Sequence, residues 1–269
     1  MKKQKWKLLV LSVVLVLMTA ACSGNGSSSS DGTEKKQPES SSVVQTEDIA
    51  RDGNDSEKAD SPNDLYARAV EDSVFAEESE IQKLVSLTKD DELVSWDEQG
   101  RVLLCTWHNY PDSYPEGEKV KIAWGPVWAF TDLEIASHAD ELKESEDAQM
   151  RLKQLISFAP DSEHTTFTGF WVDPANVRRP AYQSDPTDGS MKTAFEENVD
   201  EEFKSWFDEN ILWSYFYGSY PWTRLGYTYD WADNGSEYGM TEFIVEDGAE
   251  VEVAFTETTQ EFLDRMVEK

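Results

Sequence analysis

Apolar residues recur at helical spacing in several parts of the chain. The strongest pattern covers residues 199–217, where Phe203 and Phe207 lie on one stripe. Asp200 can cap the first turn of this helix through its side chain. Weaker helical patterns predict a helix at 64–85, one or two helices within 132–158, and a short last helix capped by Thr258 or Thr259.

Alternating apolar and aromatic runs predict short strands between these helices. Single strands are predicted at 119–130, with a bend at Gly125-Pro126, and at 165–172. Two antiparallel hairpins are predicted, joining 93–96 to 101–107 and 241–245 to 250–255. Because helices and strands follow one another without a regular βαβ rhythm, we expect an α+β fold in a single globular domain, residues 64–269.

The first 21 residues have the layout of a secretory signal peptide. Four lysines precede an apolar run from Leu8 to Met18, and small residues follow this run. The run is shorter than the ~20 apolar residues that a membrane-spanning helix needs. The segment therefore predicts export and removal of residues 1–21.

The run Leu17-Met18-Thr19-Ala20-Ala21-Cys22 resembles the lipobox of bacterial lipoproteins. In that family a signal peptidase cuts before the cysteine, whose sulfur carries a diacylglycerol. Thr19 departs from the leucine that is usual at its position, and an ordinary secreted protein cut near Ala21 is the alternative. The resemblance implies a lipid on Cys22 that anchors the protein to the cell membrane on its extracytoplasmic side.

Residues 22–63 differ in composition from the rest of the chain. After the cysteine this segment contains two serine clusters and neither an aromatic residue nor a leucine. Such a segment buries too little apolar surface to offset the entropy of ordering it. It predicts a disordered tether between the lipid anchor and the folded domain.

Charge narrows the range of partners. The chain has 54 acidic and 24 basic residues, for a formal net charge of −30, and all of the acids follow the predicted signal peptide. This balance excludes a nucleic-acid backbone as the natural partner. It attracts cations, cationic peptides or polyamines, although acidity can equally serve the solubility of an exported protein.

The stretch 203–231 holds twelve aromatic residues in 29 positions. In a structural interpretation the rings belong to the core, and Arg224 and Asp230 form a partly buried ion pair. In a functional interpretation the rings and these polar groups face a ligand such as a sugar, a peptide or a cation. The candidate ligand-binding residues are Trp222, Arg224, Tyr227, Tyr229, Asp230 and Trp231.

Two resemblances concern the part of the chain after residue 90. A group of bacterial lipoproteins and exported proteins of uncharacterised function resembles the strings FWVDPANVRRPAY, YPWTRLGYTYDW and GMTEFIVEDGAEVEV. This resemblance implies a shared domain and no particular activity. The segment 242–248, followed by alternating valines, also resembles the last strand pair of ADP-ribosyltransferases.

In ADP-ribosyltransferases a glutamate begins a strand, a glycine turn follows six places on, and the glutamate orients the nicotinamide ribose. The resemblance implies a catalytic role for Glu242. Met240 stands where many members of that family carry a second Glu or Gln, and the family's Ser-Thr-Ser element has no counterpart in this sequence.

Other catalytic patterns are missing from the sequence. The three histidines are scattered and form no His-Glu-x-x-His motif, and neither a Gly-x-Ser-x-Gly elbow nor a Walker loop is present. Cys105 lies in a strand-like run, where a buried apolar role is favoured over a thiol nucleophile. We therefore expect neither a metal nor a cofactor.

These observations favour a membrane-anchored, non-catalytic binding or interaction module. Its candidate partners are cell-wall glycan, a peptide or another envelope protein. The main alternative is an envelope enzyme, either a hydrolase or an ADP-ribosyltransferase-like protein with Glu242 at its centre. A third possibility is a purely structural envelope protein.

Overall fold

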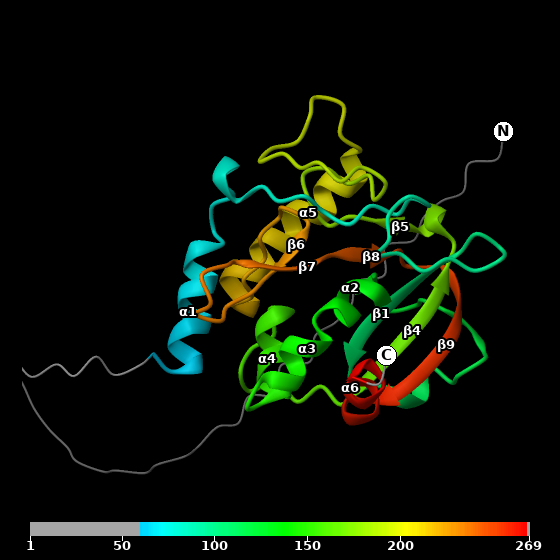
Figure 1. Ribbon diagram of the computed structural model, residues 1–269. Coiled ribbons are helices and arrows are strands. Elements are labelled where there is room, and N and C mark those ends of the chain that lie inside the picture. Colours follow the sequence, from blue (N-terminus) through cyan, green and yellow to red (C-terminus); the bar gives the residue numbers. More distant parts are fainter. Residues whose placement is uncertain (1–59, 268–269) are drawn as a thin grey trace, which may run out of the picture. The chain divides into compact units, whose positions relative to one another are not determined.

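The computed structural model describes residues 60–267, which form one α+β domain with a mostly antiparallel sheet (Figure 1). This arrangement confirms the predicted fold class. The predicted signal peptide, Cys22 and the predicted tether up to residue 59 lie outside the described residues. None of the helices within 60–267 has the length and apolar character needed to cross a membrane.

The elements follow one another in a mixed order. The helices are α1 (Pro62–Asp72), α2 (Asp132–Ser137), α3 (Ala139–Glu144), α4 (Ala148–Leu155), α5 (Glu201–Leu212) and α6 (Thr259–Val267). The strands are β1 (Val102–His108), β2 (Lys119–Lys121), β3 (Val127–Thr131), β4 (Thr166–Val172), β5 (Val177–Arg178), β6 (Tyr227–Tyr229), β7 (Tyr238–Thr241), β8 (Phe243–Val245) and β9 (Glu250–Thr258). Short 3₁₀ turns lie at Glu78–Glu80, Pro111–Ser113 and Pro174–Asn176, and a π-helical turn, Trp213–Gly218, follows α5.

Seven strands form the main sheet, in the order β2-β9-β4-β1-β3-β8-β5, and all neighbouring pairs are antiparallel. At its centre, Cys105 on β1 pairs with Phe130 on β3 and with Gly169 on β4. Strands β6 and β7 form a separate two-stranded sheet.

Each face of the main sheet covers a hydrophobic core. On one face, alternate residues such as Leu104, Phe170 and Phe243 pack under the segment that holds Val85 and Leu87. The opposite face is covered by α2, α3, α4 and α6. Its core consists mainly of Trp107, Phe130, Ile135, Leu152, Phe167 and Phe262.

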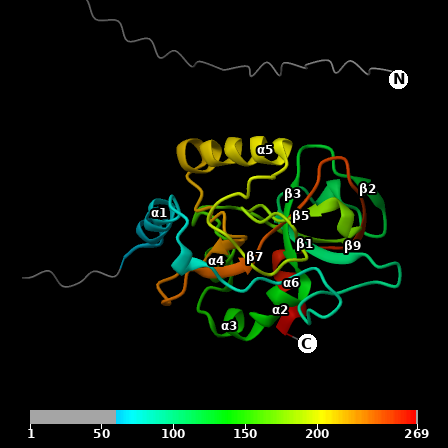
Figure 2. The same ribbon diagram turned by 90° about the horizontal axis from the view of Figure 1, so that it is seen from above.

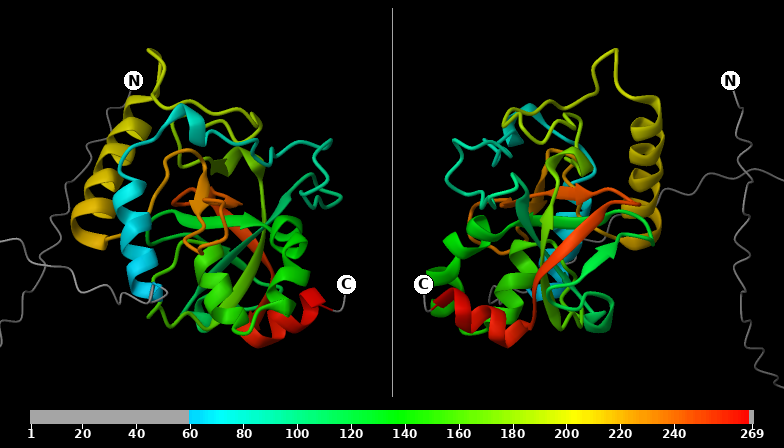
Figure 3. Two further views of the ribbon diagram at one scale, coloured as in Figure 1. Left: turned by 60° about the vertical axis from the view of Figure 1, so that its left-hand side comes forward. Right: turned by 90° about the vertical axis from the view of Figure 1, so that its right-hand side faces the viewer.

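Helix α5 lies apart from the other helices that cover the sheet. Figure 2 shows α5 along one side of the molecule, with α2, α3 and α6 along the opposite side. Figure 3 shows α1 beside α5 in its left view. Here the Tyr215 hydroxyl of the π-helical turn donates to the carbonyl of Ser73 at the end of α1, at 2.8 Å. The end of α5 and the π-helical turn form part of the wall of the candidate site.

Several helix predictions are confirmed, because local chemistry determines these helices. Helix α5 begins after Asp200, whose side chain accepts a hydrogen bond from the Phe203 N–H. Helix α6 begins after Thr258, which exchanges hydrogen bonds with Glu261. The stretch 132–158 is helical as predicted, but it is divided into three helices and not one or two.

The predicted helix at 64–85 is wrong in its second half. Helix α1 starts at Pro62 and ends at Asp72. The chain beyond it is largely extended, and Leu84 and Val85 are buried there as core residues. The Leu84 N–H donates to the Gly189 carbonyl, so tertiary contacts hold this segment away from helical geometry.

The predicted strand at 119–130 is two strands in different places. Strand β2 pairs with β9 at one edge of the sheet, whereas β3 lies between β1 and β8. Gly125, with a φ of 94°, and Pro126 separate them. What the sequence indicated as a bend is a complete break, because proline cannot donate to a ladder and this glycine has a left-handed conformation.

The predicted hairpin of 241–245 with 250–255 is also wrong. Strand β8 pairs with β3 and β5, and β9 pairs with β2 and β4. Asp247-Gly248 therefore connects two strands that are far apart in the sheet order. The other predicted hairpin is reduced to a single bridge between Trp96 and Val102.

Candidate functional site

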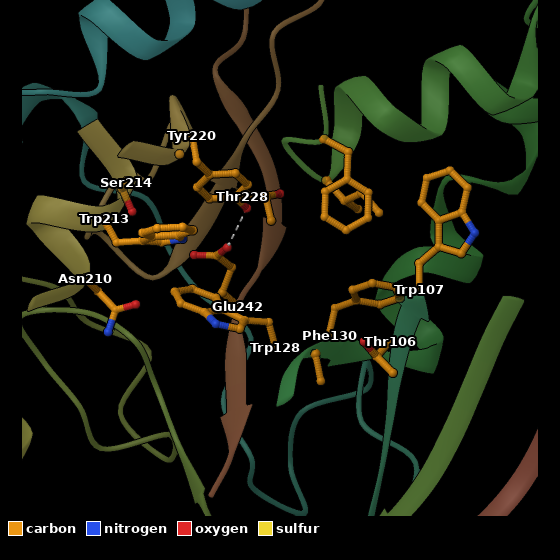
Figure 4. Close-up of a pocket in the computed structure, with 14 residues that line it drawn as sticks. Thr106, Trp107, Trp128, Phe130, Asn210, Trp213, Ser214, Tyr220, Thr228 and Glu242 are labelled. Carbon is orange, nitrogen blue, oxygen red and sulfur yellow. Dashed lines mark hydrogen bonds between the residues drawn. The ribbon is translucent and has the colours of Figure 1, made fainter. Parts of the chain in front are cut away.

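A pocket of about 540 Å³ lies between the sheet, the end of α4 and the π-helical turn (Figure 4). Its walls come from segments that are far apart in the sequence. The aromatic residues that line it are Trp107, Trp128, Phe130, Phe158, Trp213 and Tyr220. Its polar side chains are Thr106, Asn210, Ser214, Thr228 and Glu242.

Strand pairing explains why Glu242 faces this pocket. In the β3–β8 pair, Ala129 lies opposite Phe243 and Trp128 lies opposite Ile244. Ala129 and Phe243 point into the core on one side of the sheet. Because side chains alternate along a strand, Glu242 and Trp128 lie on the other side. Figure 4 shows the Glu242 carboxyl group among the rings of Trp128, Trp213 and Tyr220.

The backbone of Glu242 is fixed by the loop before β6. Its N–H donates to the Gly226 carbonyl at 2.9 Å. Gly226 has a φ of 81°, and a Cβ there would lie 2.6 Å from Cδ of the buried Arg179. Glycine therefore permits both the backbone conformation and the close approach.

The π-helical turn supplies the opposite wall. Trp213 and Ser214 face the pocket from this turn, and Asn210 faces it from the end of α5. The turn ends at Ser219 in a left-handed conformation, with a φ of 49°, and the Tyr220 N–H returns to the Ser214 carbonyl at 2.8 Å. The exposed apolar side chains of this region are Leu212, Trp213, Phe216 and Tyr217.

Glu242 is the most unusual group in the pocket. It is 3% exposed, its Oε2 has no hydrogen-bond partner, and its Oε1 accepts only a long bond of 3.5 Å from the Tyr220 hydroxyl. Burial raises the pKa of Glu242 to about 8, because a carboxylate away from water is disfavoured. At neutral pH the carboxyl group is therefore mostly protonated unless a cation lies beside it.

The other end of the pocket is apolar and tightly packed. Trp107 stacks on Phe158 and on Phe167, with 5.5 Å between ring centroids in each case. Its indole N–H donates to Thr259 at 2.8 Å, which holds the ring in place. Phe158 also stacks on His164. In Figure 4, Trp107 and Phe130 lie across the pocket from Glu242 and Asn210.

The structure buries most of the segment that the sequence predicted as a ligand-binding surface. Trp222, Tyr227 and Trp231 are at most 2% exposed. Their polar atoms bond to the carbonyls of Pro180, Glu80 and Phe158, respectively. These rings pack in the core, as the structural interpretation expects, and Tyr227 and Trp231 also line a groove on the outside of β6 and β7.

The predicted pair between Arg224 and Asp230 is wrong, because each side chain has other partners. Arg224 donates to the carbonyls of Ser73 and Val74 and so holds the end of α1. Asp230 is 2% exposed and receives two hydrogen bonds from Arg151 on α4. Arg224 thus connects the loop before β6 to the end of α1, whereas Asp230 connects the chain after β6 to α4.

The partly buried Tyr229 lies in an acidic groove on the outside of β6 and β7. Its hydroxyl donates to Asp72 at 2.9 Å, and the carboxylate oxygens of Asp72, Glu80 and Glu237 lie within 4.8 Å of one another. Burial and repulsion by neighbouring carboxylates raise the pKa of Glu80 and of Glu237. Asp72 and Glu237 are exposed.

Cys105 is fully buried in the core, which confirms its predicted structural role. His108 is also buried, with Nε2 at 2.8 Å from the Thr168 hydroxyl. Burial lowers the pKa of His108 to about 4, so the ring is neutral at physiological pH. Neither residue lines the pocket around Glu242.

The sequence indicates Glu242 only through a family resemblance, and no pattern in it predicts the walls of the pocket. The strand pair of that resemblance does not form, since β8 and β9 have other neighbours. A usable signal was present, because Glu242 is the one charged residue in the run Met240-Thr241-Glu242-Phe243-Ile244-Val245. A charge within a strand-like apolar run indicates either an edge or a functional site. Trp128, Asn210 and Trp213 carry no comparable signal.

Comparison with models of protein families, with curated protein sequences and with solved structures finds no match to this chain.

Proposed function

We propose that this chain is a non-catalytic binding protein for a small organic cation, whose positive nitrogen lies beside Glu242. The observation that supports this most directly is the unpartnered Oε2 of Glu242 inside an aromatic pocket. A buried carboxylate is stable only when it is paired. A cation in the pocket provides that pairing, and the carboxyl group releases its proton as the cation binds.

The aromatic walls suit the same ligand. The faces of Trp and Tyr rings attract cations through their quadrupoles, most strongly where water is excluded. Trp128, Trp213 and Tyr220 surround the carboxyl group in Figure 4. A carboxylate with several rings is the combination that recognises organic ammonium groups, whose alkyl substituents also gain from apolar contact.

The charges around the pocket select against anions. No lysine, arginine or histidine is found among the described residues that line it, and Glu242 is its one carboxylate. An anionic ligand would bury its charge without a partner. The formal net charge of −30 also raises the local concentration of cations around the molecule.

Binding of tetramethylammonium to the full chain tests this proposal. By isothermal titration calorimetry at pH 8.5, we expect it to bind at least tenfold more tightly than tert-butanol, a neutral molecule of similar shape. Trp213→Ala is expected to weaken binding of the cation about tenfold, by the loss of a cation–π contact of ~1–2 kcal/mol. Since Trp213 is 62% exposed, this variant should keep its fold.

Trp124→Ala is the matched control, because Trp124 is fully exposed and does not line the pocket. It is expected to bind tetramethylammonium as the unaltered chain does. Equal affinity for the cation and for tert-butanol, or equal losses in the two tryptophan variants, would refute the proposal.

One observation favours a second candidate function. A buried carboxyl group with a pKa of about 8 in an aromatic pocket has the property of a general acid. Glycoside hydrolysis requires a second carboxylate, and the described lining residues include only Glu242. We therefore rank an enzyme with Glu242 as proton donor below the binding protein. Substrate turnover that is lost in Glu242→Gln would reverse this order.

We also propose that the protein is attached to the membrane through a lipid on Cys22, as the lipobox-like run implies. The support is the sequence of residues 1–22. Expressed in a bacterial host, the protein should be recovered in the membrane fraction, with mass spectrometry showing an acylated Cys22 as its first residue. Cys22→Ser should move it to the soluble fraction or leave it unprocessed. An unlipidated mature start in the unaltered protein would overturn the attachment.

A further inference from the structure

The pocket is larger than an ammonium group. Its volume of about 540 Å³ corresponds to roughly eighteen water molecules at ~30 Å³ each. A charged nitrogen and its methyl groups beside Glu242 would leave most of this space unfilled. Sites of this size bind molecules with more heavy atoms.

The rest of the pocket is built for a hydrocarbon group. Trp107 and Ile156 are 3% and 4% exposed, and Phe158 is partly buried beside them. Stacking on Phe167 and Phe158 and the hydrogen bond to Thr259 hold the Trp107 ring. A wall that is already ordered costs little entropy when a ligand binds.

The same end of the pocket offers no partner for a charged group. The described residues lining the pocket include no basic side chain, and Figure 4 shows the uncharged Thr106 at this end, beside Phe130. A ligand carboxylate would therefore be buried without a counter-ion. This separates simple amines from amino acids, which carry both charges.

We propose that the natural ligand is a monoamine with one hydrocarbon arm and no carboxylate. Its amine lies beside Glu242, and its arm lies against the wall that Trp107, Ile156 and Phe158 form together. This inference rests on the proposed binding of cations and adds the chemical class of the ligand. Because the arm lies against an apolar wall, the pocket should prefer amines with a hydrocarbon group over amines with a charged group at that position.

Four probes that differ by one group test this inference on the unaltered full chain. Phenethylamine has both amine and arm, ethylamine lacks the arm, phenylalanine adds a carboxylate, and phenethyl alcohol replaces the amine with a neutral hydroxyl. By calorimetry at pH 8.5, phenethylamine is expected to bind ten- to a hundredfold more tightly than ethylamine, because it buries a phenyl group. Phenylalanine and phenethyl alcohol are each expected to bind at least tenfold more weakly than phenethylamine.

The outcomes separate this inference from the proposed function. Equal binding of phenethylamine and ethylamine would refute the binding of a hydrocarbon arm while leaving the proposed cation binding intact. Binding of phenylalanine as tight as that of phenethylamine would overturn the exclusion of a carboxylate. Equal binding of phenethylamine and phenethyl alcohol would instead refute the role of the cation and of Glu242.

A pair of variants locates the arm. Phe158→Ala is expected to weaken phenethylamine about tenfold while leaving ethylamine within twofold. Phe255→Ala removes a ring of similar burial that does not line the pocket, and is expected to leave both affinities unchanged. Circular dichroism and thermal melting check that both variants fold. Equal effects of Phe158→Ala on both amines would contradict the placement of the arm.

Discussion

Replacing Asp230 with alanine is expected to destabilise the domain by about 3–5 kcal/mol, which is the usual cost of leaving one partner of a buried ion pair alone. Arg151 donates to both carboxylate oxygens of Asp230, and the Ala232 N–H and the Asn234 side chain donate to them as well. Asp230→Ala removes these acceptors and leaves the Arg151 guanidinium with Glu141 alone. Urea denaturation at pH 7 measures the loss.

Asp208→Ala is the matched control for this experiment. Asp208 pairs with Lys204 on the exposed side of α5, at helical spacing. Solvent screens such an exposed pair, so its removal should change stability little. A loss below about 1 kcal/mol for Asp230→Ala would show that the Arg151–Asp230 pair does not connect α4 to the chain after β6 as the structure indicates.

Glu242→Gln is expected to remove a large pH dependence of stability. Burial raises the folded-state pKa of Glu242 from 4.5 to about 8. Between these values the folded chain binds more protons than the unfolded chain, so the free energy of unfolding falls as pH rises through this range. The slope reaches about 1.4 kcal/mol per pH unit. The variant carries no ionisable group at this position, and should be the more stable of the two proteins above pH 8.

Two histidines limit the pH range in which the contribution of Glu242 to stability can be measured alone. Burial lowers the pKa values of His108 and His164, so their contribution to stability increases as pH rises up to about 6.5. The range from pH 6.5 to 8 is therefore the clearest. Thermal melts of the unaltered chain, Glu242→Gln and the exposed control Glu98→Gln test the effect. The same slope in all three proteins would contradict it.

The proposed cation binding is expected to depend on pH through the same carboxyl group. Tetramethylammonium keeps its charge at every pH, so only the protein titrates. The other titratable residue of the pocket wall, Tyr220, has a pKa raised well above 10 by burial and stays neutral. Affinity is expected to increase about tenfold per pH unit up to pH 8 and then to level off. In Glu242→Gln binding should be weak and independent of pH.

Local chemistry made part of the fold predictable. The caps at Asp200 and Thr258 and the apolar stripe of α5 act within a few residues, and the corresponding helices are present. Strand partners depend on the whole domain. The run 241–255 has the alternation and the glycine turn of a hairpin, yet β8 and β9 find different partners across the sheet. No local pattern encodes that choice.

Less of the site than of the fold was predictable, because its walls also depend on tertiary contacts. The density of aromatic residues predicted a binding surface at 220–231, but density does not distinguish a ring in the core from a ring in a pocket wall. The wall that does form combines Trp128 on β3, Phe158 after α4 and Trp213 after α5. Only the tertiary structure brings these three together. Glu242 could be predicted from the local sequence, because a charged residue there conflicts with the apolar residues around it.

The π-helical turn has a consequence for how this protein could acquire new ligands. Trp213, Phe216 and Tyr217 are more than 60% exposed, whereas Glu242 and Trp107 are embedded in the scaffold. Substitutions on the turn can change the pocket wall that Trp213 forms with little loss of folding stability, because exposed positions tolerate change. Laboratory selection for an amine other than the one we propose would therefore begin at the turn, with Glu242 and the stacked rings retained.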